Sequence, residues 1–491
     1  MEKLYKQQIY LIIFILFVSS CSSTQTSKVE EKLSDLKKSN VAELSTKYES
    51  PYFNDKLNSN LSSEFLEHWW TALNDETLNS LITLSLDNNK DLQVAISRVN
   101  QARAELGINK SKWLPWIESS STWKTVKGLE NPSSKGDAIN TYRLGIDSSW
   151  EIDIFGGNNY KVEASKSNLK AQQSQFHATQ VTLISEIAIN YISLRSLQER
   201  LDNYETDLEL QEQSIKLLQS RYDAGLMNES KLNQAKNVAN QIKFNISSIK
   251  INIEEFMNNL ALLTGQVPGK LESLLSENKK IPSINEMIYV GIPADALRQR
   301  PDIQAAEYQL ESQLAKTESA KSELKPKLVL AGSIGLENVA GESLLSAIIG
   351  YSLLPKISIP IFNAGAIKKN IQVQSEKENE YLAIYENKIL IAVAEVRNSL
   401  TAVTQESEKN IYLKESIKNA EFNVKISKER YNSGLDNFQS VIDSQRALLS
   451  LQDQYINSEG QKIINLIGLF KSLGGGWKPL INNEVNTNHK N

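Results

Sequence analysis

Two short stretches, RYDAGL at residues 221–226 and RYNSGL at residues 430–435, decide how this chain of 491 residues is organised. They lie 209 residues apart. Two further pairs of segments recur at offsets of 207 and 211 residues: DIFGG (153–157) with PIFNAG (360–365), and KWLP (112–115) with KP (325–326). A single match would mean little, but three matches at nearly one offset indicate an internal duplication.

A seven-residue apolar period leads into each of the two turns. The period runs through Ile187, Leu194, Leu201, Leu208, Ile215 and Tyr222 in the first copy, and through Val396, Val403, Asn410, Ile417, Val424 and Tyr431 in the second. A sustained heptad predicts coiled-coil packing. As one helix, residues 157–222 would be about 100 Å long. Gly225 and Gly434 would then supply the positive φ that a sharp turn between helices favours.

Strand-like alternation precedes each long helix. Even-numbered residues from Tyr142 to Ile154 are mostly apolar and the odd-numbered ones mostly polar, and residues 349–360 alternate in the same way. Their hairpin partners are expected at 113–127 and 327–337. Each copy therefore has the order helix, two strands, very long helix, tight turn, helix. The alternation fits a half-buried soluble sheet and membrane-spanning strands about equally well.

A membrane role for these strands would constrain the assembly. Beyond the amino terminus no stretch has the roughly 20 apolar residues of a spanning helix, so a crossing would have to use strands. Four strands cannot close a barrel, because membrane barrels start at about eight. Chains would therefore have to pool their strands, eight from a dimer or twelve from a trimer.

The amino terminus reads as a lipoprotein signal peptide over residues 1–20. Lys3 and Lys6 precede an apolar run from Ile9 to Val18, which is too short to span a bilayer. The run ends in VSSC at residues 18–21, which resembles a bacterial lipobox whose cysteine is lipidated. Cys21 is the only cysteine of the chain, and the alternative is a plain buried or free thiol. Residues 21–60 are polar and are expected to form a lipidated tether.

Composition excludes several classes of protein. One Cys and three His cannot form an intrachain disulfide or a thiolate or imidazole metal cluster. With 54 basic and 58 acidic residues, the chain lacks the excess of positive charge expected of a nucleic-acid-binding protein. The sequence contains no zinc-protease, phosphate-loop or serine-hydrolase motif, so we expect no catalysis, no cofactor and no metal. Only 11 Pro residues interrupt the chain, which favours long helices.

The ordered motifs resemble those of one family. They are WW at 69–70 with Asp75, DLQVA at 91–95, WEIDIFG at 150–156, RQRPDI at 298–303, DSQR at 443–446 and LGGGW at 473–477. Together with the duplication and the lipobox, they resemble the TolC-like outer-membrane efflux proteins, in the lipoprotein branch that serves resistance–nodulation–division (RND) pumps. The similarity covers roughly residues 61–478.

The resemblance implies a mainly α-helical fold with membrane strands. Three chains would close a 12-stranded β-barrel, four strands from each, continued by a long helical coiled-coil barrel across the periplasm and an equatorial collar. The expected domains are a first repeat at 61–264, an equatorial linker at 265–297, a second repeat at 298–478 and a tail at 479–491.

The implied function is a passive exit duct in the outer membrane for drugs or other small molecules. Its partners would be a periplasmic membrane-fusion adaptor and an inner-membrane RND pump, as well as two further copies of the chain. Two alternatives remain open. One is the exit duct of a type I protein-secretion system, and the other is a structural coiled-coil lipoprotein on one side of the membrane.

The site residues implied by the resemblance lie at the two turns. The adaptor would contact Gly225, Leu226, Gly434 and Leu435. The candidates for a periplasmic gate are Tyr222, Asp223, Glu421, Lys425, Lys428, Glu429 and Tyr431. Glu421, Lys425 and Lys428 share one helix face, with Asp223, Glu229 and Glu429 as possible partners. Lys231 stands where many relatives have Asp, which argues against an acidic gate. The alternative is a solvated face with a weak Glu–Lys pair.

Overall fold

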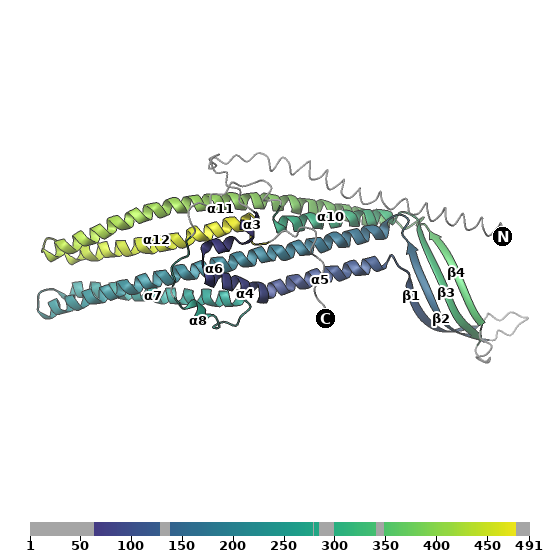
Figure 1. The fold of residues 1–491 in the computed structure, drawn as a ribbon, viewed down its shortest axis with the longest axis horizontal. Coiled ribbons are helices and arrows are strands. Elements are labelled where there is room, and N and C mark those ends of the chain that lie inside the picture. Colours follow the sequence, from purple (N-terminus) through teal and green to yellow (C-terminus); the bar gives the residue numbers. More distant parts are fainter. Residues whose placement is uncertain (1–62, 128–137, 278, 284–298, 340–347, 478–491) are drawn as a thin grey trace, which may run out of the picture. The chain divides into compact units, whose positions relative to one another are not determined.

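The computed structural model describes residues 63–127, 138–277, 279–283, 299–339 and 348–477 (Figure 1). The signal peptide, Cys21 and the tether lie outside these residues. The elements, in chain order, are α3 (Ser63–Glu67), η1 (Trp69–Leu73), α4 (Glu76–Asn88), α5 (Lys90–Ser111), β1 (Trp116–Lys127), β2 (Ala138–Ile152), α6 (Gly157–Asp223), α7 (Glu229–Leu263), α8 (Glu272–Leu275), α10 (Pro301–Ser322), β3 (Lys327–Val339), β4 (Ile348–Ser358), α11 (Ala366–Asn432) and α12 (Phe438–Ser472). Among the described helices, none has a segment both long and apolar enough to cross a membrane.

The duplication is visible in the lengths of the helices. The first helices of the two copies, α5 and α10, each have 22 residues. The long helices α6 and α11 each have 67 residues, and the returning helices α7 and α12 each have 35. The predicted order of elements within each copy is therefore confirmed. The first strand begins at Trp116 rather than at residue 113, after Pro115, which has no backbone N–H to donate to a strand ladder.

The four strands form one antiparallel sheet in the order β1-β2-β3-β4. Residues directly opposite each other share a face of the sheet. Across β2, β3 and β4, one row of opposite residues is Leu144, Leu336 and Ile349. Another row on the same face is Ile146, Ile334 and Tyr351. The predicted alternation thus becomes one largely apolar face that runs across β2, β3 and β4.

The opposite face of the sheet is mostly polar. Arg143 of β2 lies opposite Glu337 of β3, and its guanidinium binds Asp147 on the same strand at 2.6 Å. Asp147 also accepts a hydrogen bond from Ser120 of β1. The apolar side chains of the first face remain exposed in the single chain, with Tyr351 at 87% and Ile334 at 53%. A sheet with one bare apolar face needs an apolar environment or another chain to cover it.

The chain divides into two compact units, and each takes segments from both copies. One comprises the described parts of Ser97–Ser174 and Gln304–Asn387, and it contains the sheet. The other comprises those of Tyr48–Ile96, Gln175–Ile303 and Lys388–Asn491. The duplication in the sequence therefore does not correspond to two separately folded halves.

The core of the second unit is built around Trp69, which is fully buried and stacks on Phe470 at 5.3 Å. The heptad residues Ile187 and Leu194 of α6 are also fully buried in this core. Towards the end of α6 the same seam becomes more exposed, reaching 38% at Tyr222. The heptad therefore predicts the packing face correctly, while the depth of burial changes along the helix.

Candidate functional site

The turn between α6 and α7 is a Schellman motif. Gly225 has a φ of 69°. Its N–H donates to the carbonyl of Tyr222 at 2.9 Å, and the N–H of Leu226 donates to the carbonyl of Arg221 at 2.9 Å. These two bonds satisfy carbonyls that the end of a helix would otherwise leave without donors. The predicted positive φ at this glycine is confirmed.

The turn between α11 and α12 repeats this geometry. Gly434 also has a φ of 69°, and the N–H groups of Gly434 and Leu435 donate to Tyr431 and Arg430 at 3.0 and 2.9 Å. In both turns a Cβ added to the glycine would meet no atom within 4 Å. Glycine is therefore favoured at these positions by backbone conformation rather than by lack of space.

Each turn presents one exposed leucine beside its glycine. Leu226 is 77% exposed and Leu435 is 71% exposed. An asparagine caps the start of the helix that follows each turn. Asn228 Oδ1 accepts from the N–H of Ser230 at 2.9 Å, and Asn437 Oδ1 accepts from the N–H of Ser440 at 3.1 Å. Each turn is thus held by its own local hydrogen bonds, and its leucine is available for contact.

The two helical hairpins touch through the predicted gate residue Tyr431. Arg221 donates from Nη1 to the Tyr431 hydroxyl at 2.7 Å, and its guanidinium lies 5.4 Å from the centre of the ring. The ring also packs on Phe438 at 5.2 Å. Tyr222, the equivalent residue of the first copy, is 38% exposed. The duplicated tyrosines therefore have different surroundings.

The charged face of α11 is exposed in the single chain. Glu421, Lys425 and Lys428 are all exposed, and within the described residues neither lysine has a carboxylate within 4.0 Å. Asp223, Glu229 and Glu429 are thus not brought to the lysines within one chain. Burial raises the pKa of Asp207 on α6, and the charge of Lys428 acts in the opposite direction. The pairing of these lysines with Asp223, Glu229 or Glu429 in a trimer stays a prediction.

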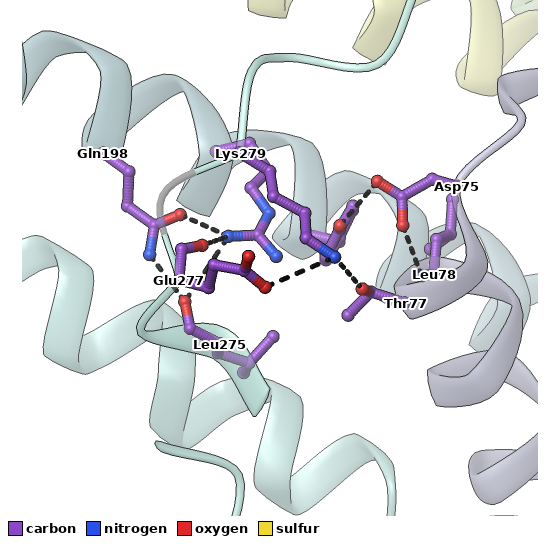
Figure 2. A network of polar contacts seen from close by, with 9 residues as sticks. Asp75, Thr77, Leu78, Gln198, Leu275, Glu277 and Lys279 are labelled. Carbon is purple, nitrogen blue, oxygen red and sulfur yellow. Dashed lines mark hydrogen bonds and ion pairs between the residues drawn. The ribbon is translucent and has the colours of Figure 1, made fainter. Parts of the chain in front are cut away.

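A buried arginine that the sequence analysis did not single out holds part of the segment between α7 and α10, and Figure 2 labels its partners Gln198, Leu275 and Glu277. Arg195 of α6 is fully buried. Its Nη1 donates to the carbonyl of Glu277 at 2.6 Å and to Gln198 Oε1 at 2.7 Å, while Gln198 donates to the carbonyl of Leu275 at 2.7 Å. These bonds attach residues 275–277 to α6. Arg195 lies outside the heptad pattern, so the sequence held no signal for it.

The same network reaches the start of α4. The Tyr191 hydroxyl donates to Asp75 Oδ2 at 2.7 Å, and Asp75 caps α4 by accepting the N–H of Leu78 at 2.9 Å (Figure 2). Burial is the main cause that raises the pKa of Tyr191 to about 12. Asp75 was noted in the sequence only as part of a family motif. The structure shows that it joins a helix cap to the face of α6.

The Arg-Pro-Asp motif at the start of α10 forms a second polar cluster, in which Arg300 is buried while the side chain of Glu395 is 49% exposed. Arg300 binds Asp302 through Nε and Nη2 at 3.0 and 2.9 Å and Glu395 of α11 through Nη2 at 2.8 Å. Its Nη1 donates to the carbonyl of Ser472, the last residue of α12, at 2.8 Å. Burial acts to raise the pKa of Asp302, but the hydrogen bond and charge of Arg300, the charge of Lys388 and the N–H of Ile303 together lower it. One guanidinium therefore joins three helices.

Comparison with known proteins shows which family has this architecture. Residues 81–266 and 292–475 match the family model described as outer membrane efflux protein. The "Solvent efflux pump outer membrane protein SrpC" of Pseudomonas putida is 29% identical over 408 residues, covering 82% of this chain and 86% of that protein. The solved outer-membrane channel OprN is 30% identical with a TM-score of 0.79, covering 84% of this chain and 93% of that one. The Campylobacter jejuni CmeC outer membrane channel is 25% identical with a TM-score of 0.79, covering 87% and 91%.

A four-stranded sheet combined with two very long helical hairpins is thus the fold of outer-membrane channels. The chain belongs to the outer membrane efflux protein family, because the family model matches most of its length. The resemblance inferred from the motifs is confirmed, and with it a function in efflux at the outer membrane. The family consists of channels, which transport compounds and do not catalyse reactions.

Proposed function

We propose that this protein is the outer-membrane exit duct of a tripartite efflux system, and that it passively conducts drugs or other small molecules. An inner-membrane RND pump and a periplasmic adaptor would deliver them. Relatives are named for solvent efflux and for pyoverdine export, which supports small molecules as the cargo. The observation that carries the proposal is the sheet, with its continuous apolar face and opposite polar face.

The working unit in this proposal is a homotrimer. Within the described residues β1 and β4 each pair on one side only, and an open edge is not tolerated in lipid. Three sheets joined edge to edge would form a 12-stranded barrel with the apolar face towards lipid and the face of Arg143 and Asp147 towards the pore. The helical hairpins would continue the pore through the periplasm.

The turns of the hairpins would form the periplasmic tip. We assign the contact with the adaptor to Gly225, Leu226, Gly434 and Leu435, because both leucines are exposed beside a locally stabilised turn. The gate would be formed by Tyr222, Asp223, Glu421, Lys425, Lys428, Glu429 and Tyr431. The bond from Arg221 to Tyr431 supports this assignment, because it links the two hairpins next to the turns.

The remaining assignments concern the parts outside the hairpins. Residues 1–20 would be removed as a signal peptide, Cys21 would carry the lipid and residues 21–60 would form the tether. The linker at 265–297, together with both termini, would form an equatorial collar. Its described part is held to α6 by Arg195, which supports a location beside the helices.

The assembly can be tested by native mass measurement of the detergent-solubilised protein. We expect a trimer, and a stable folded monomer would contradict the shared barrel.

Transport can be tested in cells that lack the chromosomal copy but retain its pump and adaptor. The full-length protein should restore low accumulation of a pump substrate. Restored export of a polypeptide instead would indicate a protein-secretion duct.

A further inference from the structure

In each copy, the residue just before the 22-residue helix donates a side-chain hydrogen bond to the carbonyl of the last residue of the 35-residue helix. Asn89 and Arg300 directly precede the 22-residue helices α5 and α10. Asn89 Nδ2 donates to the carbonyl of Leu263 at 2.9 Å, and Arg300 Nη1 donates to the carbonyl of Ser472 at 2.8 Å. Leu263 and Ser472 are the last residues of α7 and α12. The end of each hairpin is therefore attached at the same point.

The chemistry of the two attachments differs. Arg300 also binds Asp302 and Glu395, and its side chain is only 8% exposed. The first copy retains both acids at the equivalent positions, as Asp91 and Glu186. Its central residue, Asn89, is neutral and binds Leu263 and caps α5 at the N–H of Leu92. Among the described residues, neither Asp91 nor Glu186 makes an ion pair.

We infer that Arg300 is a positioning residue that clamps the second hairpin, so that the two hairpins are restrained unequally at this end. Its guanidinium joins α11, the end of α12 and the start of α10, and a charged hydrogen bond is stronger than a neutral one. The five N–H groups of arginine form a rigid fork. Sliding α11 along α12 would therefore break either the ion pair of Arg300 with Glu395 or its hydrogen bond to the carbonyl of Ser472. Among the described residues, the ion pairs between α6 and α7 are those of Lys243 with Glu212 and Lys250 with Glu205, and none attaches α6 to the end of α7.

The clamp also bears on the tip, and this step rests on the proposed channel function. Glu395 and Tyr431 belong to one continuous helix, α11. A shift of α11 at Glu395 would be transmitted along the helix to Tyr431 and would strain its bond with Arg221. The clamp thereby sets the register in which the two hairpins meet next to their turns.

The first experiment removes the clamp from the full-length protein in detergent. Arg300→Gln should make the amides at the end of α12, residues 469–473, exchange with solvent about tenfold faster. Glu395→Gln should produce a smaller change in the same amides. The end of α7 serves as the internal control and should be unchanged. Equal exchange in the wild type and both variants would overturn the clamp.

The second experiment builds the clamp into the first copy and does not depend on removing a buried charge. The double substitution Asn89→Arg and Lys90→Pro creates an Arg-Pro-Asp motif at residues 89–91, with Asp91 as its aspartate. Asn89 has φ −60° and ψ 135°, the extended conformation that a following proline requires. Amides 260–264 at the end of α7 should exchange more slowly, and Glu186→Gln should abolish the gain. A gain that survives Glu186→Gln, or no gain, would contradict the proposed geometry.

A third measurement separates the clamp from the channel function. In planar bilayers Arg300→Gln should open more often than wild type at the same voltage, because Tyr431 loses its register. An unchanged open frequency in a conducting variant with faster exchange would overturn the link from the clamp to the tip. A wild-type protein that conducts no ions would instead count against the proposed channel, while the exchange results would still decide the clamp.

Discussion

At the scale of single residues, burial gives one histidine an unusual environment. His177 of α6 lies 4.8 Å from the ring of Trp477 and 5.3 Å from that of Phe176, and its Nδ1 has no hydrogen-bond partner among the described residues. Burial lowers the pKa of His177, although a hydrogen bond with Gln180 acts in the opposite direction. The neutral form is therefore favoured in the folded protein.

This environment predicts a pH dependence of stability. Because the pKa of His177 is lower in the folded state than its unfolded value of about 6.5, the unfolded state binds the proton first as the pH falls. The stabilisation is present above that value and is lost progressively below it. Thermal unfolding should show a lower Tm at pH 5.5 than at pH 7.5, with a smaller difference in His177→Phe. The exposed His68, replaced in the same way, is the control, and equal differences in all three proteins would contradict the prediction.

The positive φ of the turn glycines leads to a second prediction at this scale. Gly434→Ala should destabilise the turn by about 1 kcal/mol, because alanine is strained in the left-handed region. Gly107 in α5 is a matched control, since a Cβ there also meets nothing within 4 Å and its φ is not positive. Gly107→Ala should be neutral or stabilising. Hydrogen exchange of the amides around each substituted glycine measures the two effects, and equal effects of the two substitutions would exclude a conformational role for Gly434.

At the scale of elements, the sheet and the long helices follow from simple periodicity. A period of two separates the faces of a strand, and a period of seven marks the seam of a long helix. The register of the sheet places apolar residues of β2, β3 and β4 opposite one another on the same face. Neighbouring positions on one strand should therefore respond differently to the same substitution.

Tyr351 and Ser352 of β4 provide the direct comparison. Tyr351 belongs to the apolar face, whereas Ser352 lies opposite Ser333 on the polar face. A lysine on a lipid-facing position costs about 2–4 kcal/mol near the middle of a bilayer. Tyr351→Lys should thus reduce the amount of assembled protein in the outer-membrane fraction, while Ser352→Lys should leave it near wild type. Equal amounts of both variants would show that the apolar face does not contact lipid.

The charged face of α11 leads to a prediction about selectivity. If Lys425 and Lys428 face the lumen near the tip, replacing both with Glu should shift the reversal potential in planar bilayers towards cation selectivity and change the conductance. The neutral variant with Gln at both positions should be intermediate. If selectivity and conductance both stay at wild-type values, the lysines face solvent outside the channel.

At the scale of the whole molecule, two separate anchors would hold the protein in the outer membrane: the sheet and the lipid on Cys21. Labelling cells with a radioactive fatty acid should mark the wild type and leave Cys21→Ala unlabelled. The variant should mature or sort less well, yet retain partial function, because the proposed barrel would still anchor the protein. Equal labelling of the two proteins would show that VSSC is not a lipidation site.

The clusters around Arg195 and Arg300 were not predicted from the sequence, although the Arg-Pro-Asp motif was noticed as part of the resemblance. Besides the nearby Asp302 and Gln198, their partners lie 80 or more residues away, as in the bonds of Arg300 to the carbonyl of Ser472 and of Arg195 to the carbonyl of Glu277. No local period encodes such a pairing. It depends on which helix faces meet once the chain has folded.

The sequence by itself determined the duplication, the long helices, both turns, the alternation of the strands and the family. Each of these depends on residue spacing within one element or on a motif that recurs at a constant offset. Only the tertiary structure decided that Arg300 binds three helices while Asn89 binds one carbonyl. It also decided that Tyr431 contacts Arg221 while Tyr222 remains partly exposed. Equivalent positions diverge in this way because burial and charge pairing depend on neighbours far along the chain.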